Sequence, residues 1–316
     1  MDDEYNVTYI TLTGHVDVHK HRYLYFFILF TVYILIICCN FTIAVLIWIH
    51  RNLHEPMYVF IAALLINSVL FSSNIYPKLL IDFLSEKQVI SYSACLLQFH
   101  AIYSLAGSEF LLLSAMAYDR YVSICKPLQY PTIMRKTTVI VFLILSWLIP
   151  ACHITVLAVI TIAEAKLCNL TLKGIFCNNS LYKVPCVRSS LITVFGVLAM
   201  LDLVIFPSLF IVFTYTKILI ISYRSCKEVR KKAAETCLPH LLVLVSCSCL
   251  SVYDVTIARV ESNFPKIARL IMTVQIVLYH PLFNPLIYGL KMKEISKHLK
   301  RLFSSYSLLA KITTNI

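Results

Sequence analysis

The chain has 316 residues, of which 59% are hydrophobic and 14% charged, with a mean hydropathy of +0.79 and a net charge of +12. Soluble domains carry about 45–50% apolar and about 25% charged residues, so this composition excludes an ordinary water-soluble enzyme or a disordered chain. The positive charge does not indicate nucleic-acid binding, because the basic residues lie in short segments between apolar runs, as in membrane proteins.

The first 23 residues contain Asp2, Asp3 and Glu4 and lack a basic segment followed by an apolar core. We therefore expect no cleavable signal peptide, and the first apolar run must direct its own insertion. The expected organisation is a single domain with an extracellular N-terminus (1–23), a helix bundle (24–290) and a cytoplasmic tail (291–316).

Seven apolar stretches follow one another along the chain. They cover residues 24–49, 57–84, 96–125, 137–162, 190–221, 237–258 and 267–290. Each is long enough to cross the hydrocarbon core, where unpaired backbone groups require helical structure. The sequence therefore predicts an all-α fold, a bundle of seven transmembrane helices in a lipid bilayer.

The basic residues predict the orientation of this bundle. Of the 28 lysines and arginines, 17 lie in one set of connecting segments and 11 in the other. Because the richer side of a membrane protein is cytoplasmic, we expect the N-terminus outside the plasma membrane and the C-terminus inside. Three glycosylation sequons, at Asn6, Asn169 and Asn178, fall on the predicted outer side.

Most of the twelve cysteines lie within apolar runs, and no spacing typical of a metal site occurs. Four cysteines instead flank or occupy the predicted outer segments: Cys95, Cys168, Cys177 and Cys186. An oxidising exterior favours disulfides. A bridge between Cys95 and Cys177 would clamp the loop between the fourth and fifth spans, and Cys168 and Cys186 could then pair. Free thiols are the alternative for each pair.

Beyond the last span, apolar residues recur at helical spacing between basic ones. They are Ile295, Leu299, Leu302 and Phe303. This pattern predicts a short amphipathic helix lying on the inner leaflet.

Two motifs mark the predicted inner ends of spans. Asp119-Arg120-Tyr121 ends the third span, where the Asp–Arg pair could form an ionic lock that a conformational change releases. Interfacial snorkelling of Arg120 is the alternative. In the last span, Pro285 removes a backbone donor and predicts a kink, Asn284 could satisfy the freed carbonyls, and Tyr288 could act as a rotamer switch.

Together these motifs resemble those of the rhodopsin-like G-protein-coupled receptors, and four segments resemble olfactory receptors in particular. Residues 53–58 read LHEPMY, and residues 116–128 match MAYDRYVAICxPL except at Ser123. Residues 232–241 resemble KAxxTCxxHL, and residues 281–291 resemble PxxNPxIYxLR. The segments LHEP (53–56) and IYPK (75–78) are similar to those of the olfactory receptors for water-borne odorants, as in fish.

The resemblance implies a receptor that is not an enzyme and needs no resident cofactor. Its partners would be a small odorant and a heterotrimeric G protein of the stimulatory type that raises cyclic AMP. The G protein would enter a cleft lined by Arg120, Tyr215 and Tyr288. A non-olfactory rhodopsin-like receptor is one alternative. A seven-helix transporter is the other, but Glu109, Asp202 and Asp254 form no evident relay along the spans.

The resemblance also implies a ligand pocket in the outer halves of the spans. Its candidate residues are Ile102, Tyr103, Ala106 and Gly107 in the third span, and Ser248, Val252, Val255 and Arg259 in the sixth. Ordinary helix packing is the alternative for each. A guanidinium clamps carboxylates, so Arg259 would favour an acidic or zwitterionic odorant. A salt bridge to Asp254 or Glu261 would instead neutralise it.

Besides Asp119, the third span contains one acidic residue far from its ends. Glu109 precedes Arg120 by eleven residues, and Ser68 occupies the second-span position at which most rhodopsin-like receptors carry an aspartate. A buried carboxylate requires neutralisation or a partner. Glu109 is therefore a candidate site for a sodium ion or a proton, and a neutral acid hydrogen-bonded to Ser68 or Asn284 is the alternative.

Overall fold

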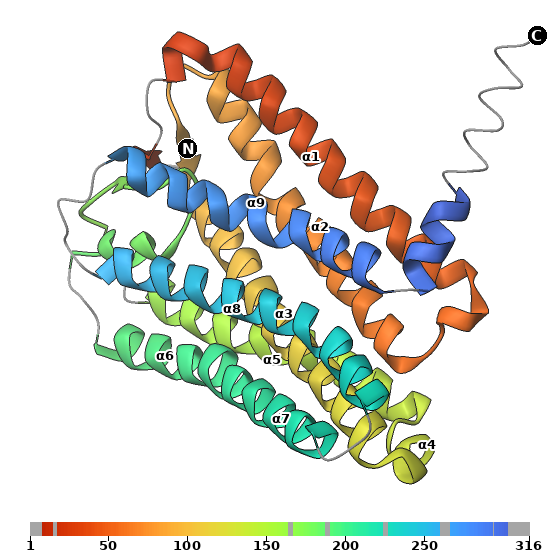
Figure 1. Cartoon of the computed structure of the whole chain (residues 1–316). Helices are drawn as coiled ribbons and strands as arrows, with labels where there is room; N and C mark the ends of the chain where they lie inside the picture. Colours follow the sequence, from red (N-terminus) through yellow and green to blue (C-terminus); the bar gives the residue numbers. More distant parts are fainter. Residues whose placement is uncertain are drawn as a thin grey trace, which may run out of the picture.

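A computed structural model of the chain describes residues 8–14, 18–163, 167–186, 190–223, 227–259, 266–292 and 294–302. Within these ranges, seven long helical segments lie side by side (Figure 1). They are α1 (Val18–Ile49), α2 (Pro56–Leu84), α3 (Tyr92–Cys125), α5 (Lys136–Ala163), the segment α6–η4–α7, α8 (Lys227–Arg259) and α9 (Lys266–Lys291). The bundle of seven helices predicted from the apolar stretches is therefore confirmed.

The segment α6–η4–α7 is one span with a local change of winding. α6 (Ser190–Met200) and α7 (Phe206–Tyr223) are joined by η4 (Leu201–Ile205), a π-helical turn. Such a turn inserts an extra residue into the helix and is common at functional sites. Here it allows Leu203 to point into the protein while the neighbouring Asp202 side chain remains 43% exposed.

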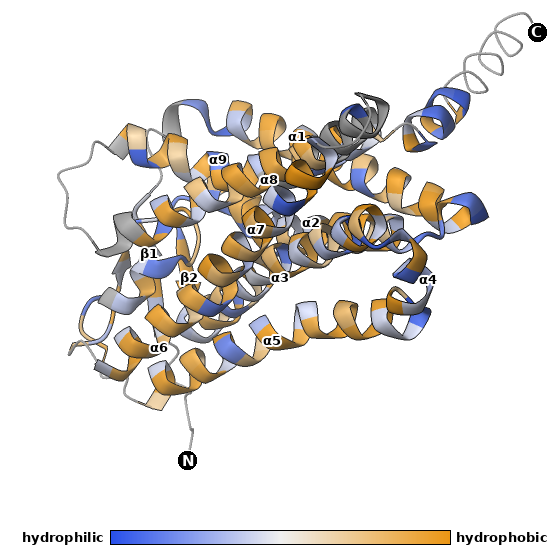
Figure 2. Cartoon of the chain, turned by 60° about the horizontal axis from the view of Figure 1, so that its bottom comes forward, coloured by the Kyte–Doolittle hydropathy of each residue, from blue (hydrophilic) through white to orange (hydrophobic). Residues whose placement is uncertain are grey.

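Five segments are long and apolar enough to cross a membrane: His21–Ile49, Pro56–Leu84, Tyr92–Cys125, Lys136–Ala163 and Ser190–Tyr223. The bent pair Ile267–Tyr279 and Pro281–Gly289 supplies a sixth, whereas the apolar part of α8, His240–Val255, is shorter. The middle parts of the helices are predominantly hydrophobic, and hydrophilic residues gather towards their ends (Figure 2). The chain is a multi-pass membrane protein.

A small sheet caps one end of the bundle, which we call the sheet end. β1 (Tyr9–Leu12) pairs antiparallel with β2 (Val89–Ser91) and parallel with β3 (Thr171–Leu172). The sheet thus joins the N-terminal segment to the connections that precede α3 and α6. The fully buried Ile10 and nearly buried Leu12 anchor β1 by burying their apolar surface.

The opposite end, which we call the α4 end, carries the short helix α4 (Tyr130–Ile133) and a helix over residues 294–302 (Figure 1). The predicted amphipathic tail helix therefore exists, but it does not simply lie on a surface. Ile295 is fully buried and Leu299 packs against the same core cluster. His298 reaches the loop after α1, where its Nε2 lies 3.2 Å from Asn52 Nδ2. Phe303 lies outside the described residues.

Candidate functional site

A cavity of about 310 Å³ lies among α3, α5, α6, η4 and α8, towards the sheet end, and the loop of residues 167–186 also lines it. Most of its wall is apolar or aromatic, as in sites for small organic molecules. All four candidates in α3 line it: Ile102, Tyr103, Ala106 and Gly107. The pocket predicted for this face of α3 therefore coincides with a cavity.

Gly107 has a steric reason to be glycine. A Cβ atom added there would lie 2.9 Å from Pro150 Cβ of α5 and 3.2 Å from Leu203 Cδ1 of η4. Because interiors are close-packed, a side chain would push α3 away from both neighbours. The missing side chain therefore sets the spacing of the three segments that enclose the cavity.

Only one of the described candidates in α8 lies at the cavity. Val255 lines the cavity, but Ser248 does not, and Val252 is 50% exposed on the outer surface of the bundle. The residues of α8 that do line the cavity are Leu250, Ser251, Asp254 and Val255. The helix is rotated relative to our prediction, because nearly every residue of this span is apolar or small and gives little indication of the buried side.

Asp254 is the polar centre of this face of the cavity. Its Oδ2 accepts a 2.6 Å hydrogen bond from the Tyr103 hydroxyl and a 2.7 Å bond from Asn179 Nδ2. The backbone N–H of Asn179 in turn donates to the Tyr103 hydroxyl oxygen at 2.8 Å. These three residues join α3, α8 and the loop of residues 167–186. Arg259 ends α8, and its side chain lies outside the described residues.

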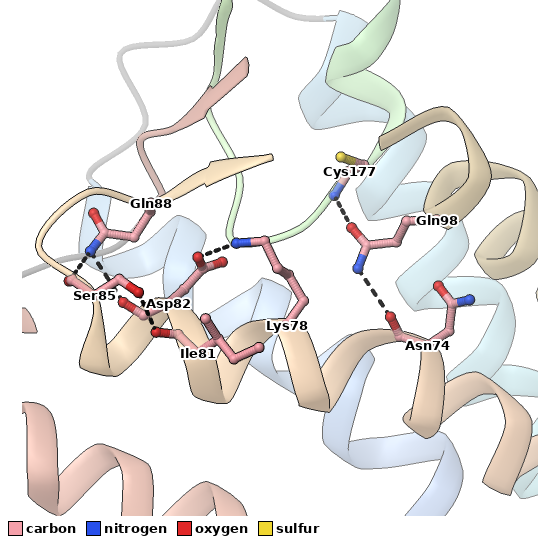
Figure 3. A network of polar contacts seen from close by, with 8 residues as sticks. All are labelled: Asn74, Lys78, Ile81, Asp82, Ser85, Gln88, Gln98 and Cys177. Atoms are coloured by element: carbon pink, nitrogen blue, oxygen red, sulfur yellow. Dashed lines mark hydrogen bonds and ion pairs between the residues drawn. The ribbon is translucent and has the colours of Figure 1, made fainter. Parts of the chain in front are cut away.

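The loop of residues 167–186 is fixed across the sheet end by two disulfides. Cys95 at the start of α3 is joined to Cys177, with a Cα–Cα distance of 5.4 Å, and Cys168 is joined to Cys186 at 4.8 Å. Both predicted pairs are present. Gln98 adds a polar clamp, because its Oε1 accepts from the Cys177 backbone N–H and its Nε2 donates to the Asn74 carbonyl (Figure 3).

A second polar group at the sheet end lies at the end of α2. Lys78 forms an ion pair with Asp82, one helical turn further along (Figure 3). Gln88 Nε2 donates to the Asp82 and Ser85 carbonyls at 3.2 and 3.0 Å. These bonds satisfy backbone carbonyls at the end of the helix and orient the turn that leads into β2.

The three sequons differ in their surroundings. Asn169 is exposed, and its Oδ1 accepts from the Thr171 hydroxyl at 2.6 Å. Asn178 is only 4% exposed, and its Oδ1 accepts from the Ser180 backbone N–H at the start of a 3₁₀ turn. A buried side chain occupied in a cap is inaccessible to a glycan, so the prediction for Asn178 does not fit this conformation. Asn6 lies outside the described residues.

Midway along the bundle, Glu109 is held by side chains from two other helices. Asn284 Nδ2 of α9 donates to Glu109 Oε1 at 2.9 Å and to Ser68 Oγ at 3.2 Å, and Cys247 of α8 forms a further hydrogen bond with Glu109. The bond from Asn284 is one of those expected for a hydrogen-bonded acid, whereas Ser68 is bonded to Asn284. A sodium ion needs oxygen ligands, but here an amide nitrogen lies between the two oxygens.

α9 is kinked before Pro285, but the side chain that satisfies the freed carbonyl differs from our prediction. The helix bends by 43° between Tyr279 and Pro281, one turn before Pro285. Pro285 lacks the N–H that would bond the Pro281 carbonyl. Asn40 of α1 replaces it, because its Nδ2 donates to that carbonyl at 2.8 Å. Asn284, which we expected in this role, instead contacts Glu109 and Ser68.

At the α4 end of α3, Arg120 forms an ion pair with Asp119, and its Nε donates to Asp119 Oδ2 at 2.9 Å. Asp119 is fully buried, and the Arg120 side chain is 13% exposed. The other carboxylate oxygen accepts a 2.8 Å bond from the Tyr130 hydroxyl of α4. The structure therefore contains the predicted Asp–Arg pair, with a third member. Tyr121 packs partly buried against the same core.

Next to this pair, a buried histidine lies between two buried tyrosines. The His240 ring of α8 has its centroid 6.3 Å from that of Tyr215 and 5.4 Å from that of Tyr288. The Tyr288 hydroxyl lies 3.3 Å from His240 Nδ1. The predicted switch residues Tyr215 and Tyr288 are thus brought together by His240, which belongs to the motif of residues 232–241.

Four residues of these sites were not assigned to them from the sequence. Tyr130 and Gln98 carry no signal, because single polar side chains in a loop or at a helix start are common. Asn179 was noticed only as part of a sequon. Asp254 was noticed, but as a partner for Arg259 rather than as part of the cavity wall. Residues three or four positions apart share one face of a helix, so a count from Leu250 and Ser251 reaches Asp254 and Val255 together.

Comparison with known proteins agrees with these observations. Residues 29–306 match the family model described as "Olfactory receptor". The chain is 36% identical over 293 residues to olfactory receptor 11H2 of Homo sapiens, covering 90% of this chain and 88% of that protein. It is 32% identical to olfactory receptor 11A1 of Homo sapiens, with 94% of each chain covered, and 28% identical to olfactory receptor 4M1 of Mus musculus.

The match covers all but the first turns of the bundle, including the third-span Asp–Arg pair, the loop with its two disulfides and the Asn–Pro pair of the last span. Members of this family are receptors rather than enzymes. The chain therefore belongs to the olfactory receptor family.

Proposed function

We propose that the protein is an odorant receptor of the plasma membrane that binds a small ligand in the cavity and activates a stimulatory G protein, raising cyclic AMP. The observation that supports this most directly is the position of both sites on α3. Gly107 lines the cavity, and Arg120 lies thirteen residues further along the same helix, about 20 Å at 1.5 Å per residue.

Coupling between the ligand cavity and the G-protein site follows from contacts that the helices make at the two ends of the bundle. A ligand shifts the receptor only if it binds the active conformation more tightly than the inactive one. The cavity is lined by α3, α5, α6, η4 and α8. Since α3 packs against α8, a ligand contacts both the helix that carries Arg120 and a helix that packs against it. A movement of α8 would separate His240 from Tyr215 and Tyr288, free Arg120 and open a cleft for a helix of the G protein.

The distribution of charge supports an orientation with the sheet end outside. The basic-rich connecting segments lie at the α4 end, which is then cytoplasmic. Both disulfides lie at the sheet end, where an oxidising exterior would maintain them. Arg259 ends α8 at this same mouth, and an acidic or zwitterionic ligand is what its guanidinium would select.

For Glu109, the hydrogen bonds favour a proton over sodium. Sodium binding would require the Asn284 amide to turn its oxygen towards Glu109 and Ser68. In the present arrangement Asn284 donates to both. We propose that Glu109 is a neutral, hydrogen-bonded acid in this conformation.

The test is a cyclic-AMP reporter assay in cells that express the full chain, with amino acids, carboxylic acids, amines and steroids as ligands. We expect at least one class to raise cyclic AMP, and Arg120→Gln to abolish that response at equal surface expression. Arg51→Gln is the matched control, because Arg51 is an exposed arginine at the same end of the bundle. A response that survives in Arg120→Gln would contradict the proposal.

A further inference from the structure

We infer that Asp254 anchors a ligand that carries a protonated amine, so that the chemical class recognised by this receptor is small organic amines. The inference rests on the proposed receptor function and adds the polar group that its ligand must have. It agrees with the zwitterionic ligand that Arg259 would accept, because a zwitterion carries an ammonium group, and it disagrees with a purely acidic one.

The first argument is the charge of the cavity wall. Asp254 is 9% exposed and lines a cavity whose other walls are mainly apolar or aromatic. A carboxylate in such surroundings is costly, and neutral hydrogen-bond donors lower that cost without pairing its charge. Among the residues with described side chains, no lysine, arginine or histidine lies within 4 Å of Asp254. A cation brought by a ligand would supply the missing compensation.

The second argument is the arrangement of the existing bonds. The bonds from Tyr103 and Asn179 both end on Oδ2, and both donors are neutral. They fix the orientation of the carboxylate without neutralising it. In the described part of the chain no hydrogen bond ends on Oδ1, so this oxygen keeps its capacity to accept from an ammonium group.

The third argument is the aromatic group beside the carboxylate. The ring centroid of Phe99 lies 4.5 Å from that of Tyr103 and 5.6 Å from that of Tyr182, and all three residues line the cavity. Aromatic faces attract ammonium ions, and they also pack against alkyl groups. An ammonium bound at Asp254 would therefore have both a counter-charge and a favourable ring environment.

The other acidic residue of the cavity wall is less suited to this role. Glu109 also lines the cavity, but it already accepts from Asn284 and is hydrogen-bonded to Cys247. It lies six residues beyond Tyr103 on α3, about 9 Å deeper at 1.5 Å per residue. Asp254 is the carboxylate that an entering ligand meets near the loop.

The test compares hexylamine, hexan-1-ol and hexanoic acid, which share one alkyl chain, in the cyclic-AMP assay on cells that express the full chain. The wild type should respond to hexylamine at the lowest concentration. Asp254→Asn keeps the shape of the side chain but removes its charge. It should raise the half-maximal concentration for hexylamine at least about 30-fold, as expected for a lost buried charge pair, and leave that for hexan-1-ol unchanged.

Two further variants complete the test. Asp254→Glu keeps the charge and should keep the preference for the amine over the alcohol. Asp202→Asn makes the same chemical change at a carboxylate that does not line the cavity and is paired with His153, 3.2 Å away. It should leave the amine response unchanged. Surface biotinylation verifies that each variant reaches the membrane.

The outcomes separate the two proposals. If hexylamine is no more potent than hexan-1-ol on the wild type, or if Asp254→Asn responds to it normally, the amine inference is overturned, while any response to the alcohol or acid leaves the receptor function in place. If Asp254→Asn does not reach the cell surface, the relative potencies of the three ligands on the wild type test the amine inference. If no ligand class raises cyclic AMP in cells with the receptor at their surface, the proposed receptor function is contradicted.

Discussion

The Tyr130 hydroxyl donates a 2.8 Å hydrogen bond to Asp119 Oδ1, so α4 holds the carboxylate that neutralises Arg120. Burial and the neighbouring Asp119 carboxylate raise the pKa of Tyr130. The phenol is therefore a proton donor at every physiological pH. Arg120 is thus held indirectly by a segment that connects two spans.

This relationship predicts that Tyr130→Phe raises basal signalling. The substitution removes one hydrogen bond to a charged group, worth about 1.5–3 kcal/mol, from the state in which the Asp119–Arg120 pair is closed. If the bond is absent from the active state, the inactive state loses at least about tenfold in relative population. Cyclic AMP measured without ligand should rise accordingly.

The matched control for this prediction is Tyr23→Phe. Tyr23 is 61% exposed near the start of α1, at the sheet end. This variant should keep the basal level of the wild type. Basal cyclic AMP that is unchanged in Tyr130→Phe, at equal surface expression, would show that α4 does not restrain Arg120.

A second prediction concerns Glu109. Glutamine has the shape of a neutral glutamic acid, so Glu109→Gln can still accept from Asn284. We expect thermal stability within about 1 kcal/mol of the wild type, whereas Glu109→Ala leaves Asn284 without its acceptor and costs about 1–3 kcal/mol. Thermal unfolding of the two purified variants and of the wild type measures both changes in stability.

The same proteins distinguish a proton from sodium. A bound ion stabilises the folded state in proportion to the logarithm of its concentration. Exchange of sodium chloride for choline chloride should therefore leave the wild-type melting temperature unchanged. A sodium-dependent increase that Glu109→Gln abolishes would establish the ion site instead.

The bundle could be predicted from the sequence because lipid imposes it. Runs such as 24–49 and 137–162 are too apolar for any other structure, and their ends in the structure, Ile49 and Ala163, agree to within one residue. The pairs Cys95–Cys177 and Cys168–Cys186 were also predictable, because few cysteines lie outside the apolar runs.

The rotation of each helix about its own axis, which determines the side that faces the protein, was harder to predict. A membrane span is apolar on both its lipid side and its protein side, so Val252 and Leu250 look alike in sequence, although one is 50% exposed and the other 9%. The bond from Asn40 to the Pro281 carbonyl depends on how α1 and α9 pack. Such contacts between distant segments have no local pattern.

A third prediction concerns the sequons. Asn169→Gln should remove one glycan, because Asn169 is exposed in the loop. Asn178→Gln should not change glycosylation, since this side chain is buried, but it should destabilise the loop by about 0.5–2 kcal/mol through loss of the cap on Ser180. Gel mobility before and after glycosidase treatment, with melting temperatures, separates the two effects. A mobility change in Asn178→Gln would show that the loop opens during synthesis.

The last prediction ranks the two disulfides. Cys177 is fully buried and its bridge spans 82 residues, whereas Cys168 is exposed and its bridge spans 18. A bridge that closes a longer loop restricts the unfolded chain more, and Cys177 also positions the loop through Gln98. Cys177→Ser should therefore lower the melting temperature and ligand response more than the double change Cys168→Ser and Cys186→Ser. Cys152→Ser, at an exposed free thiol, is the control. Equal losses from both bridges would mean that closure of the cavity depends on the entire loop rather than on its attachment to α3.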